Sequence, residues 1–272
     1  MSQFLSRLLV VFLVTFVSAK AAEGPSSFFG FTVTPAAESS GLLSADSRAV
    51  LISPSFEIAA GIYQISGQQV SRVDATGSVS LPDLPLLLDQ PSGALVDGRL
   101  YVAGGSTLFV LDLAASGSAW VELASMPLET EGEPALAGLH GILYLAGAGV
   151  NGTQTFSYNP SQDRWSELAA APQDLRGYLG TSCGNDHILY FNANQTDDRI
   201  LAYHRITDTW FEMGQLPQAI LPLAVGSSET EFSLYAAGVT VSGKALLRPT
   251  KYGWVDHSVV AVLVLLLVGV GL

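Results

Sequence analysis

The sequence predicts an all-β fold assembled from copies of one unit that is about 45 residues long. Tryptophan recurs every 45 residues, at Trp120, Trp165 and Trp210, and Trp254 follows 44 residues later. The same 45-residue step separates three prolines: Pro127, Pro172 and Pro217. Similarity at such a period is typical of propeller blades or of a solenoid, in which each unit needs neighbours to bury its apolar faces.

Each unit contains an apolar segment of strand length. These segments are LYVAGG at 100–105, LYLAGA at 143–148, LYFNAN at 189–194 and LYAAGV at 234–239. They are rich in Val, Leu, Tyr and Phe, and Gly, Asn, Asp or Ser ends them, so they predict β-strands. A charged content of only 13% and a total of 27 glycines also favour a tightly turned all-β protein.

The order of features within a unit predicts a four-stranded antiparallel meander. A short strand such as SGALV (92–96) leads to a tight turn at Asp97 and Gly98. The next strand ends in a glycine pair or its remnant, and a third strand ends in Tyr or Asp. A turn such as NPSQDR (159–164) follows, and the fourth strand begins at Trp.

With this unit defined, the chain resembles the kelch family of β-propellers. The residues that carry the resemblance are Gly104, Gly105, Tyr158, Trp165, Tyr203 and Trp210. The resemblance covers residues 51–254, although the double glycine is intact only once. It implies an all-β, kelch-type β-propeller of five or six four-stranded blades. It implies no particular activity, because function resides in the loops.

Five units can be recognised, at 51–85, 86–127, 128–172, 173–217 and 218–254, and the first of them lacks the tryptophan. The N-terminal segment 22–50 carries no repeat signature, but FFGFTVT (28–34) predicts a strand. Propellers often close their ring with strands from both chain ends. We therefore expect this strand to close the ring or to begin a sixth blade.

The beginning of the chain predicts export. Residues 1–21 have the features of a secretory signal peptide: a positive charge at Arg7, the apolar run LLVVFLVTFV at 8–17, and the small-residue cleavage pattern at 19–21. We therefore expect the propeller, residues 51–254, on the periplasmic or extracellular face of a membrane.

The other end of the chain predicts a membrane anchor. Residues 255–272 are almost wholly apolar and are just long enough for a transmembrane helix. Two interpretations are open. One is a lipid-anchor signal, with small residues at Ser242 and Gly243 ahead of the apolar tail. The other is that the chain is the front of a longer membrane protein.

The second interpretation rests on a further resemblance. The segment WVDHSVVAVLVLLLVGVGL (254–272) resembles the opening helix of sodium:solute symporters, with Gly269 and Gly271 near its end. An exported kelch propeller joined to such a helix is similar to sialic acid mutarotase domains fused to sialic acid transporters. The resemblance implies an isomerase that interconverts the anomers of sialic acid (N-acetylneuraminate). It also implies a fused or partner sodium-coupled transporter and no metal or redox cofactor.

Charge and residue content argue against several other function classes. A net charge of −12 at pH 7 argues against nucleic acid and anionic membrane surfaces as partners. The single Cys183 excludes an internal disulfide, and its apolar context predicts a buried, inert thiol. His140 and His187 fall in turn positions and are expected to be exposed. No zinc spacing, phosphate loop or nucleophile elbow is present, so we expect no metal site.

The candidate site residues lie in the loops that enter the innermost strand of each unit. In a propeller this strand lines the central channel, so the preceding loop reaches the channel mouth. Three of these loops bring polar groups to corresponding places: Asp89 and Gln90, Glu131 and Glu133, and Asp174 and Arg176. From these we predict four substrate-binding residues: Gln90, Glu131, Asp174 and Arg176.

The mutarotase resemblance implies catalytic roles for Arg176 and Glu133. Arg176 is expected to hold a substrate carboxylate through two parallel hydrogen bonds. Glu133 is expected to exchange a proton with a sugar hydroxyl while the ring opens and recloses at its anomeric carbon. Two alternatives stay open: Arg176 is structural, and Glu131 and Glu133 are solvated loop charges. The alternative function is a non-catalytic kelch module that binds a carbohydrate or protein ligand at the cell surface.

Overall fold

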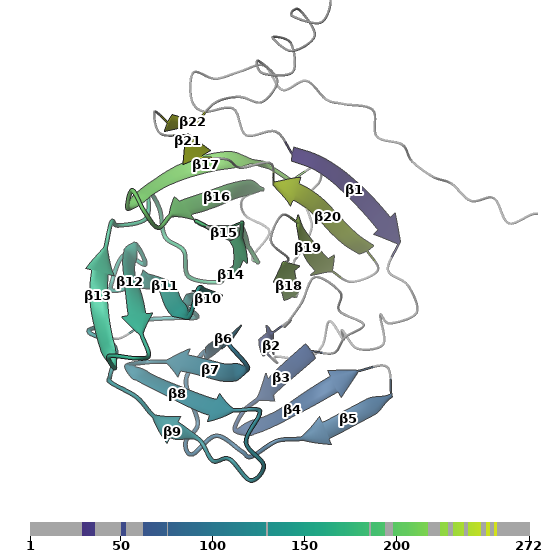
Figure 1. Cartoon of the computed structure of the whole chain (residues 1–272), viewed down its shortest axis with the longest axis vertical. Coiled ribbons are helices and arrows are strands. Elements are labelled where there is room, and N and C mark those ends of the chain that lie inside the picture. The colour runs from purple at the N-terminus through teal and green to yellow at the C-terminus, as the bar shows by residue number, and fades with distance from the viewer. Residues whose placement is uncertain are drawn as a thin grey trace, which may run out of the picture.

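The computed structural model of the chain describes residues 29–35, 50–52, 62–74, 76–128, 130–184, 186–193, 198–216, 224–227, 231–236, 239–245, 249–250 and 253–254. Every regular element within these residues is a β-strand (Figure 1). No helix in this part of the chain is long and apolar enough to cross a membrane. The predicted signal peptide (1–21) and transmembrane helix (255–272) lie outside the described residues.

Within the described residues, five four-stranded antiparallel sheets make up the body. The first contains β2 (Val50–Ile52), β3 (Ile62–Ser66), β4 (Gln69–Asp74) and β5 (Gly77–Ser80). The second contains β6 (Ser92–Val96), β7 (Arg99–Gly104), β8 (Thr107–Asp112) and β9 (Val121–Glu122). The third contains β10 (Ala135–Leu139), β11 (Ile142–Ala148), β12 (Gln154–Asn159) and β13 (Arg164–Leu168). The fourth contains β14 (Tyr178–Cys183), β15 (His187–Asn192), β16 (Arg199–His204) and β17 (Thr209–Gln215).

The fifth sheet joins the two ends of the chain. It contains β18 (Ala224–Ser227), β19 (Glu231–Ala236), β20 (Val239–Ala245) and β1 (Phe29–Pro35). Strand β1 pairs antiparallel with β20, so that Phe29 lies opposite Ala245 and Pro35 opposite Val239. The N-terminal strand is therefore the outer strand of the fifth sheet and does not begin a sixth.

The five sheets are arranged as the blades of a propeller (Figure 1). The innermost strands contact one another in sequence, from β2 to β6, β10, β14 and β18, and β18 contacts β2 again. These contacts close the ring with five blades. The predicted all-β fold of four-stranded sheets is thus confirmed. A short ladder of β21 (Pro249–Thr250) and β22 (Gly253–Trp254) lies outside the five sheets, so Trp254 is not in a blade.

The apolar core lies between the blades. One buried cluster joins the first and second sheets, including Val70 and Leu100. A second joins the second and third sheets, and a third joins the third and fourth sheets. All six residues of β15 are buried, on both faces of the strand. The first four blades therefore bury apolar side chains against their neighbours, as a repeat fold requires.

The repeated tryptophans tie each blade to the preceding one. Trp165 donates its indole N–H to the carbonyl oxygen of Ala124, 2.9 Å away, in the segment that follows the outer strand of the second blade. The same bond recurs one blade earlier and one blade later, from Trp120 to Pro82 at 2.8 Å and from Trp210 to Ala169 at 2.8 Å. The 45-residue spacing thus reflects a repeated hydrogen bond between blades.

An aspartate beside each of two tryptophans completes this connection. The Asp163 carboxylate accepts hydrogen bonds from the Tyr158 hydroxyl, at 2.5 Å, and from the backbone N–H of Ala124, at 2.8 Å. In the fourth blade the same pair of bonds involves Asp208, Tyr203 and Ala169. Both aspartates have positive φ, near 50°, a conformation that Asp adopts more readily than most residues. The Asp and Trp of one unit therefore bond to the same residue near the preceding blade, and the Tyr hydroxyl donates to that Asp.

One turn differs from its prediction. Asp97 and Gly98 form the expected two-residue turn between β6 and β7, with positive φ at both positions. The corresponding turn of the fourth blade has three residues, because Cys183 pairs with His187. His187 is therefore the first residue of β15 and only 1% exposed, which makes its predicted exposure wrong. His140 is exposed, as predicted.

Candidate functional site

The three predicted loops lie on one face of the propeller. They precede β6, β10 and β14, which are neighbouring innermost strands (Figure 1). A backbone hydrogen bond joins the second loop to the third, from the N–H of Gly177 to the carbonyl oxygen of Glu133, at 2.8 Å. The second and third loops are thus held side by side where β10 and β14 begin.

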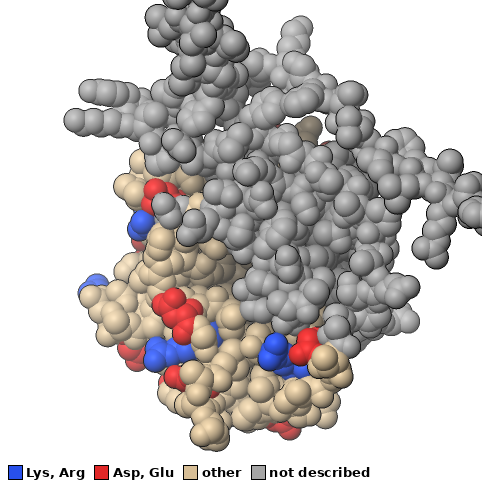
Figure 2. All heavy atoms as spheres, turned by 45° about the vertical axis from the view of Figure 1, so that its right-hand side comes forward, with Lys and Arg blue, Asp and Glu red and all other residues tan. Residues whose placement is uncertain are grey.

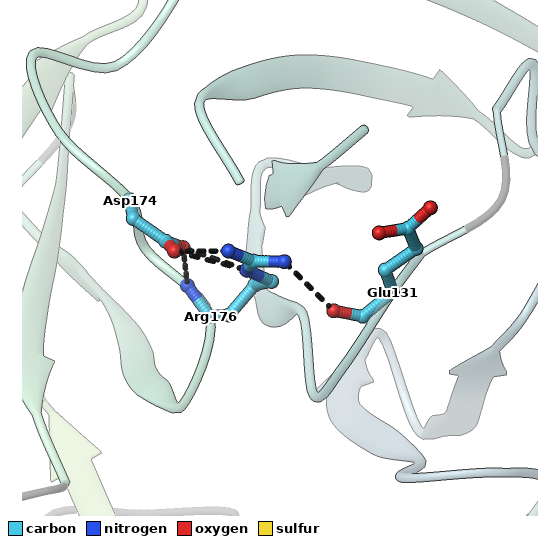
Figure 3. Close-up of polar contacts among 3 residues, drawn as sticks. All are labelled: Glu131, Asp174 and Arg176. Carbon is cyan, nitrogen blue, oxygen red and sulfur yellow. Dashed lines mark hydrogen bonds and ion pairs between the residues drawn. The ribbon is translucent and has the colours of Figure 1, made fainter. Parts of the chain in front are cut away.

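Arg176 is the centre of the polar contacts in this region (Figure 3). Its Nε lies 2.9 Å from Oδ1 and 3.0 Å from Oδ2 of Asp174, and its Nη2 also donates to Oδ2. Its Nη1 donates to the backbone carbonyl oxygen of Glu131, at 3.2 Å. The guanidinium therefore bridges the second and third loops, and its side chain keeps 30% of its surface exposed.

Gln90 of the first loop reaches the same place. A Cβ atom built on Gly132 would lie 3.2 Å from Cδ of Arg176 and 3.5 Å from Oε1 of Gln90. Gly132 has a φ of +122°, which side chains rarely tolerate. The glycine thus lets the arginine and the glutamine approach the same stretch of backbone, and the structure brings Gln90, Glu131 and Arg176 together.

Glu133 differs from the other carboxylates of the site. It is partly buried, and no described residue forms a hydrogen bond or ion pair with its carboxyl group. Burial raises the pKa of Glu133, because desolvation disfavours the charged form. A carboxyl group with a raised pKa can both give and take a proton closer to neutral pH. The backbone of Glu133 is joined to the loop of Arg176 by the hydrogen bond from the Gly177 N–H.

Asp174 has the opposite electrostatic environment. The hydrogen bond from the Arg176 side chain is the largest influence and lowers the pKa of Asp174. The backbone N–H of Arg176 also donates to Oδ1, at 2.9 Å. Asp174 therefore stays ionised at neutral pH, and its charge balances that of Arg176. Figure 2 shows the same pattern elsewhere, with basic side chains beside acidic ones on the described surface in that view.

A second polar group at the same end of the fourth blade was missed from the sequence. The Tyr178 hydroxyl accepts hydrogen bonds from Nε2 of Gln173, at 2.6 Å, and from Nδ2 of Asn192, at 3.3 Å. Arg199 donates to Oε1 of Gln173. One signal was available: Asn192 stands where LYVAGG and LYLAGA carry alanine. A polar residue at a buried alanine position of a repeat indicates a hydrogen-bonding partner nearby.

Two other kinds of site, a metal site and a reactive thiol, find no support among the described residues. No cluster of His, Cys, Asp or Glu that could hold a metal ion occurs within the described residues. Cys183 is buried, as predicted, and its burial raises the pKa of the thiol to about 12.

The comparisons with known proteins can be set against this geometry. Over 95 residues the chain is similar to N-acetylneuraminate epimerase. The identity is 31% with the enzymes of two Haemophilus influenzae strains, PittEE and 86-028NP, and it covers 31% of this chain. The chain matches about a quarter of the length of these curated relatives, 25% in each case. No protein-family model matches the sequence.

Two solved structures are similar in fold. The protein YjhT is 20% identical, with a TM-score of 0.49 over 57% of this chain and 59% of its own. Virginiamycin B lyase from Staphylococcus aureus is 11% identical, with a TM-score of 0.50 over 74% of this chain and 67% of its own. The latter likeness concerns the fold alone. It supports the predicted propeller, and the local similarity to N-acetylneuraminate epimerase confirms the predicted resemblance to the sialic acid mutarotase family. The fused transporter stays a prediction.

Proposed function

We propose that the propeller binds N-acetylneuraminate at the channel mouth and interconverts its anomers. The observation that carries the proposal is the position of Arg176, which bridges two neighbouring loops and has Gln90 close by. The local similarity to N-acetylneuraminate epimerase supports the same substrate class. Arg176 and Glu133 are the residues to which we assign the reaction.

Arg176 would bind the carboxylate of the sugar acid. A guanidinium carries five N–H donors in a planar fork. Asp174 occupies the edge formed by Nε and Nη2, and the Glu131 carbonyl oxygen accepts one bond from Nη1. We assign the ligand to the edge formed by Nη1 and Nη2, where each nitrogen carries a second hydrogen, and this edge can hold a carboxylate through two parallel hydrogen bonds.

Glu133 would move the protons. Ring opening breaks the bond between the anomeric carbon and the ring oxygen, while the anomeric hydroxyl loses its proton and becomes a carbonyl. The Glu133 carboxylate accepts that proton and passes it to the ring oxygen, so the group ends in its original state. Reclosure on the other face of the carbonyl reverses the transfers and gives the other anomer. The raised pKa of Glu133 moves its titration toward neutral pH, which favours proton exchange there.

A second candidate function is binding without catalysis. Its support is that the contacts of Arg176 with Asp174 and with the Glu131 carbonyl oxygen join two loops, a role that requires no reaction. A module that binds a carbohydrate needs only a complementary surface at this mouth, and Glu133 would then be a partly buried loop charge. The two functions differ in whether the anomers exchange faster.

Proton NMR on N-acetylneuraminate freshly released as the α anomer tests the proposal. The full chain is added, and the conversion of α to β is followed against the spontaneous rate. Acceleration in proportion to protein concentration supports mutarotation. Broadened ligand signals at an unchanged rate support the binding module. If the protein causes neither acceleration nor broadening, both functions are contradicted.

A further inference from the structure

We infer that Asp174 is a positioning residue that holds Arg176 through the Nε–Nη2 edge of its guanidinium, and that the ligand is held by the adjacent edge, formed by Nη1 and Nη2. The inference rests on the proposed function and refines it. The sequence pattern predicted Asp174 as a residue that touches substrate. The contacts in Figure 3 favour a different role, in which Asp174 acts through Arg176.

Both carboxylate oxygens of Asp174 accept hydrogen bonds from Arg176. Oδ1 accepts from the backbone N–H and from Nε of Arg176, and Oδ2 accepts from Nε and Nη2. All these donors belong to one residue. An ionised carboxylate has no donor of its own and repels a second carboxylate. Asp174 is therefore poorly suited to contact an anionic ligand directly.

The contacts with Asp174 and with the Glu131 carbonyl oxygen orient the Arg176 side chain. A free arginine side chain loses rotamer entropy when it is immobilised. The side-on pair with Asp174 and the bond to the Glu131 carbonyl oxygen hold the side chain before a ligand arrives. A ligand carboxylate then meets a donor edge that is already oriented, so less of this cost falls on binding.

The backbone at Gly152 lies against the pair of Asp174 and Arg176. Gly152, in the β11–β12 connection, has a φ of +63°. A Cβ atom at this position would overlap the Asp174 carboxylate and lie 2.7 Å from Nε of Arg176. The ion pair thus packs against bare backbone, and it has little room to rotate toward this side.

The experiment is a double-mutant cycle on the full chain with Asp174→Asn, Arg176→Gln and the double variant. Binding is measured for N-acetylneuraminate and for its methyl ester, which lacks the negative charge. We expect Asp174→Asn to weaken the affinity for the acid, and to raise its KM, at least tenfold. The affinity for the ester and kcat should stay within about threefold. In the Arg176→Gln background, Asp174→Asn should have no further effect.

Several outcomes would overturn the inference. An additive effect in the Arg176→Gln background would show that Asp174 contacts the ligand itself. Equal losses for acid and ester would indicate a purely structural role, and Asp174→Asn with unchanged acid binding would indicate no role. A wild-type chain that neither binds the acid nor speeds anomer exchange would overturn the proposed function as well. Asp83→Asn is the control, because it makes the same change at an exposed carboxylate in the loop before β6. Asp174→Ser serves as a second variant if Asp174→Asn does not fold.

Discussion

The indole N–H of Trp165 donates a hydrogen bond to the carbonyl oxygen of Ala124, 2.9 Å away, and so joins the third blade to the second. The same relationship recurs at Trp120 and Trp210. Because no blade can bury both of its faces alone, bonds between blades bear on the stability of the whole ring.

Trp165→Phe should lower the free energy of unfolding by about 1 kcal/mol, the usual net value of one hydrogen bond. Phenylalanine keeps an aromatic ring near Tyr158, whose ring centroid lies 4.9 Å from that of Trp165. Urea denaturation measures the change. Val121→Ala is the control, because Val121 is 55% exposed on the outer strand β9. An unchanged midpoint for Trp165→Phe would mean that the bond contributes nothing to stability.

Glu133→Gln should make the protein more stable at neutral pH. The folded-state pKa of Glu133 is raised by burial, so ionisation is easier in the unfolded chain. Stability from this group is therefore complete below the unfolded pKa and is lost as the pH rises through the folded pKa. Glutamine removes that loss. Denaturation at pH 4 and pH 7 measures it, with the exposed Glu167→Gln as control. A lower stability of Glu133→Gln at pH 7 would contradict the assignment of an unpaired carboxylate.

Gly152→Ala should weaken binding of the sugar acid, because the added Cβ overlaps the Asp174 carboxylate and displaces the pair with Arg176. Gly117→Ala provides a matched control. Gly117 also has a positive φ, +73°, but a Cβ atom there meets nothing within 4 Å. Both variants carry similar backbone strain, so only Gly152→Ala should change affinity. Titration calorimetry with N-acetylneuraminate gives the comparison, and equal affinities for the two variants would rule out this role of Gly152.

His187 should make the fold sensitive to acid. Burial, and then the neighbouring His204, lowers the pKa of His187 from 6.5 to about 4. The folded state therefore keeps this ring neutral, and the unfolded chain takes up the proton first. Stability from this group is present above pH 6.5 and is lost as the pH falls toward 4. The full effect is at most about 3 kcal/mol.

His187→Phe tests this expectation. The centroid of the His187 ring lies 4.7 Å from that of His204 and 5.8 Å from that of Phe211, so an aromatic replacement fits the same surroundings. The difference in unfolding free energy between pH 7 and pH 4.5 should shrink in this variant. His140→Gln, at an exposed turn, serves as control. If His187→Phe and the wild type lose equal stability on acidification, His187 is not the group responsible.

The sequence was sufficient to predict the repeated unit and the loops of the site. The spacing of Trp120, Trp165 and Trp210 has a direct physical cause in the hydrogen bonds between blades, so it is visible as a period. The loops before β6, β10 and β14 could be aligned with one another by the same period. Their meeting in space follows from the contacts among those strands.

Features that lack a period could not be predicted. The side-on pair between Asp174 and Arg176 depends on the conformation of one loop, and two residues of separation do not determine it. His187 was misplaced because its turn is longer than that at Asp97 and Gly98. The pairing of β1 with β20 joins distant parts of the chain, and only the expectation of ring closure pointed to it.

The most direct test of the central claim is the rate of anomer exchange of N-acetylneuraminate at pH 7, measured by NMR for the wild-type chain and for Glu133→Gln. The account predicts that the wild type exceeds the spontaneous rate and that the variant loses about a hundredfold or more of this acceleration, as expected when a general acid–base is removed. A variant as active as the wild type would contradict the role of Glu133. A wild type no faster than the spontaneous reaction would contradict mutarotation itself.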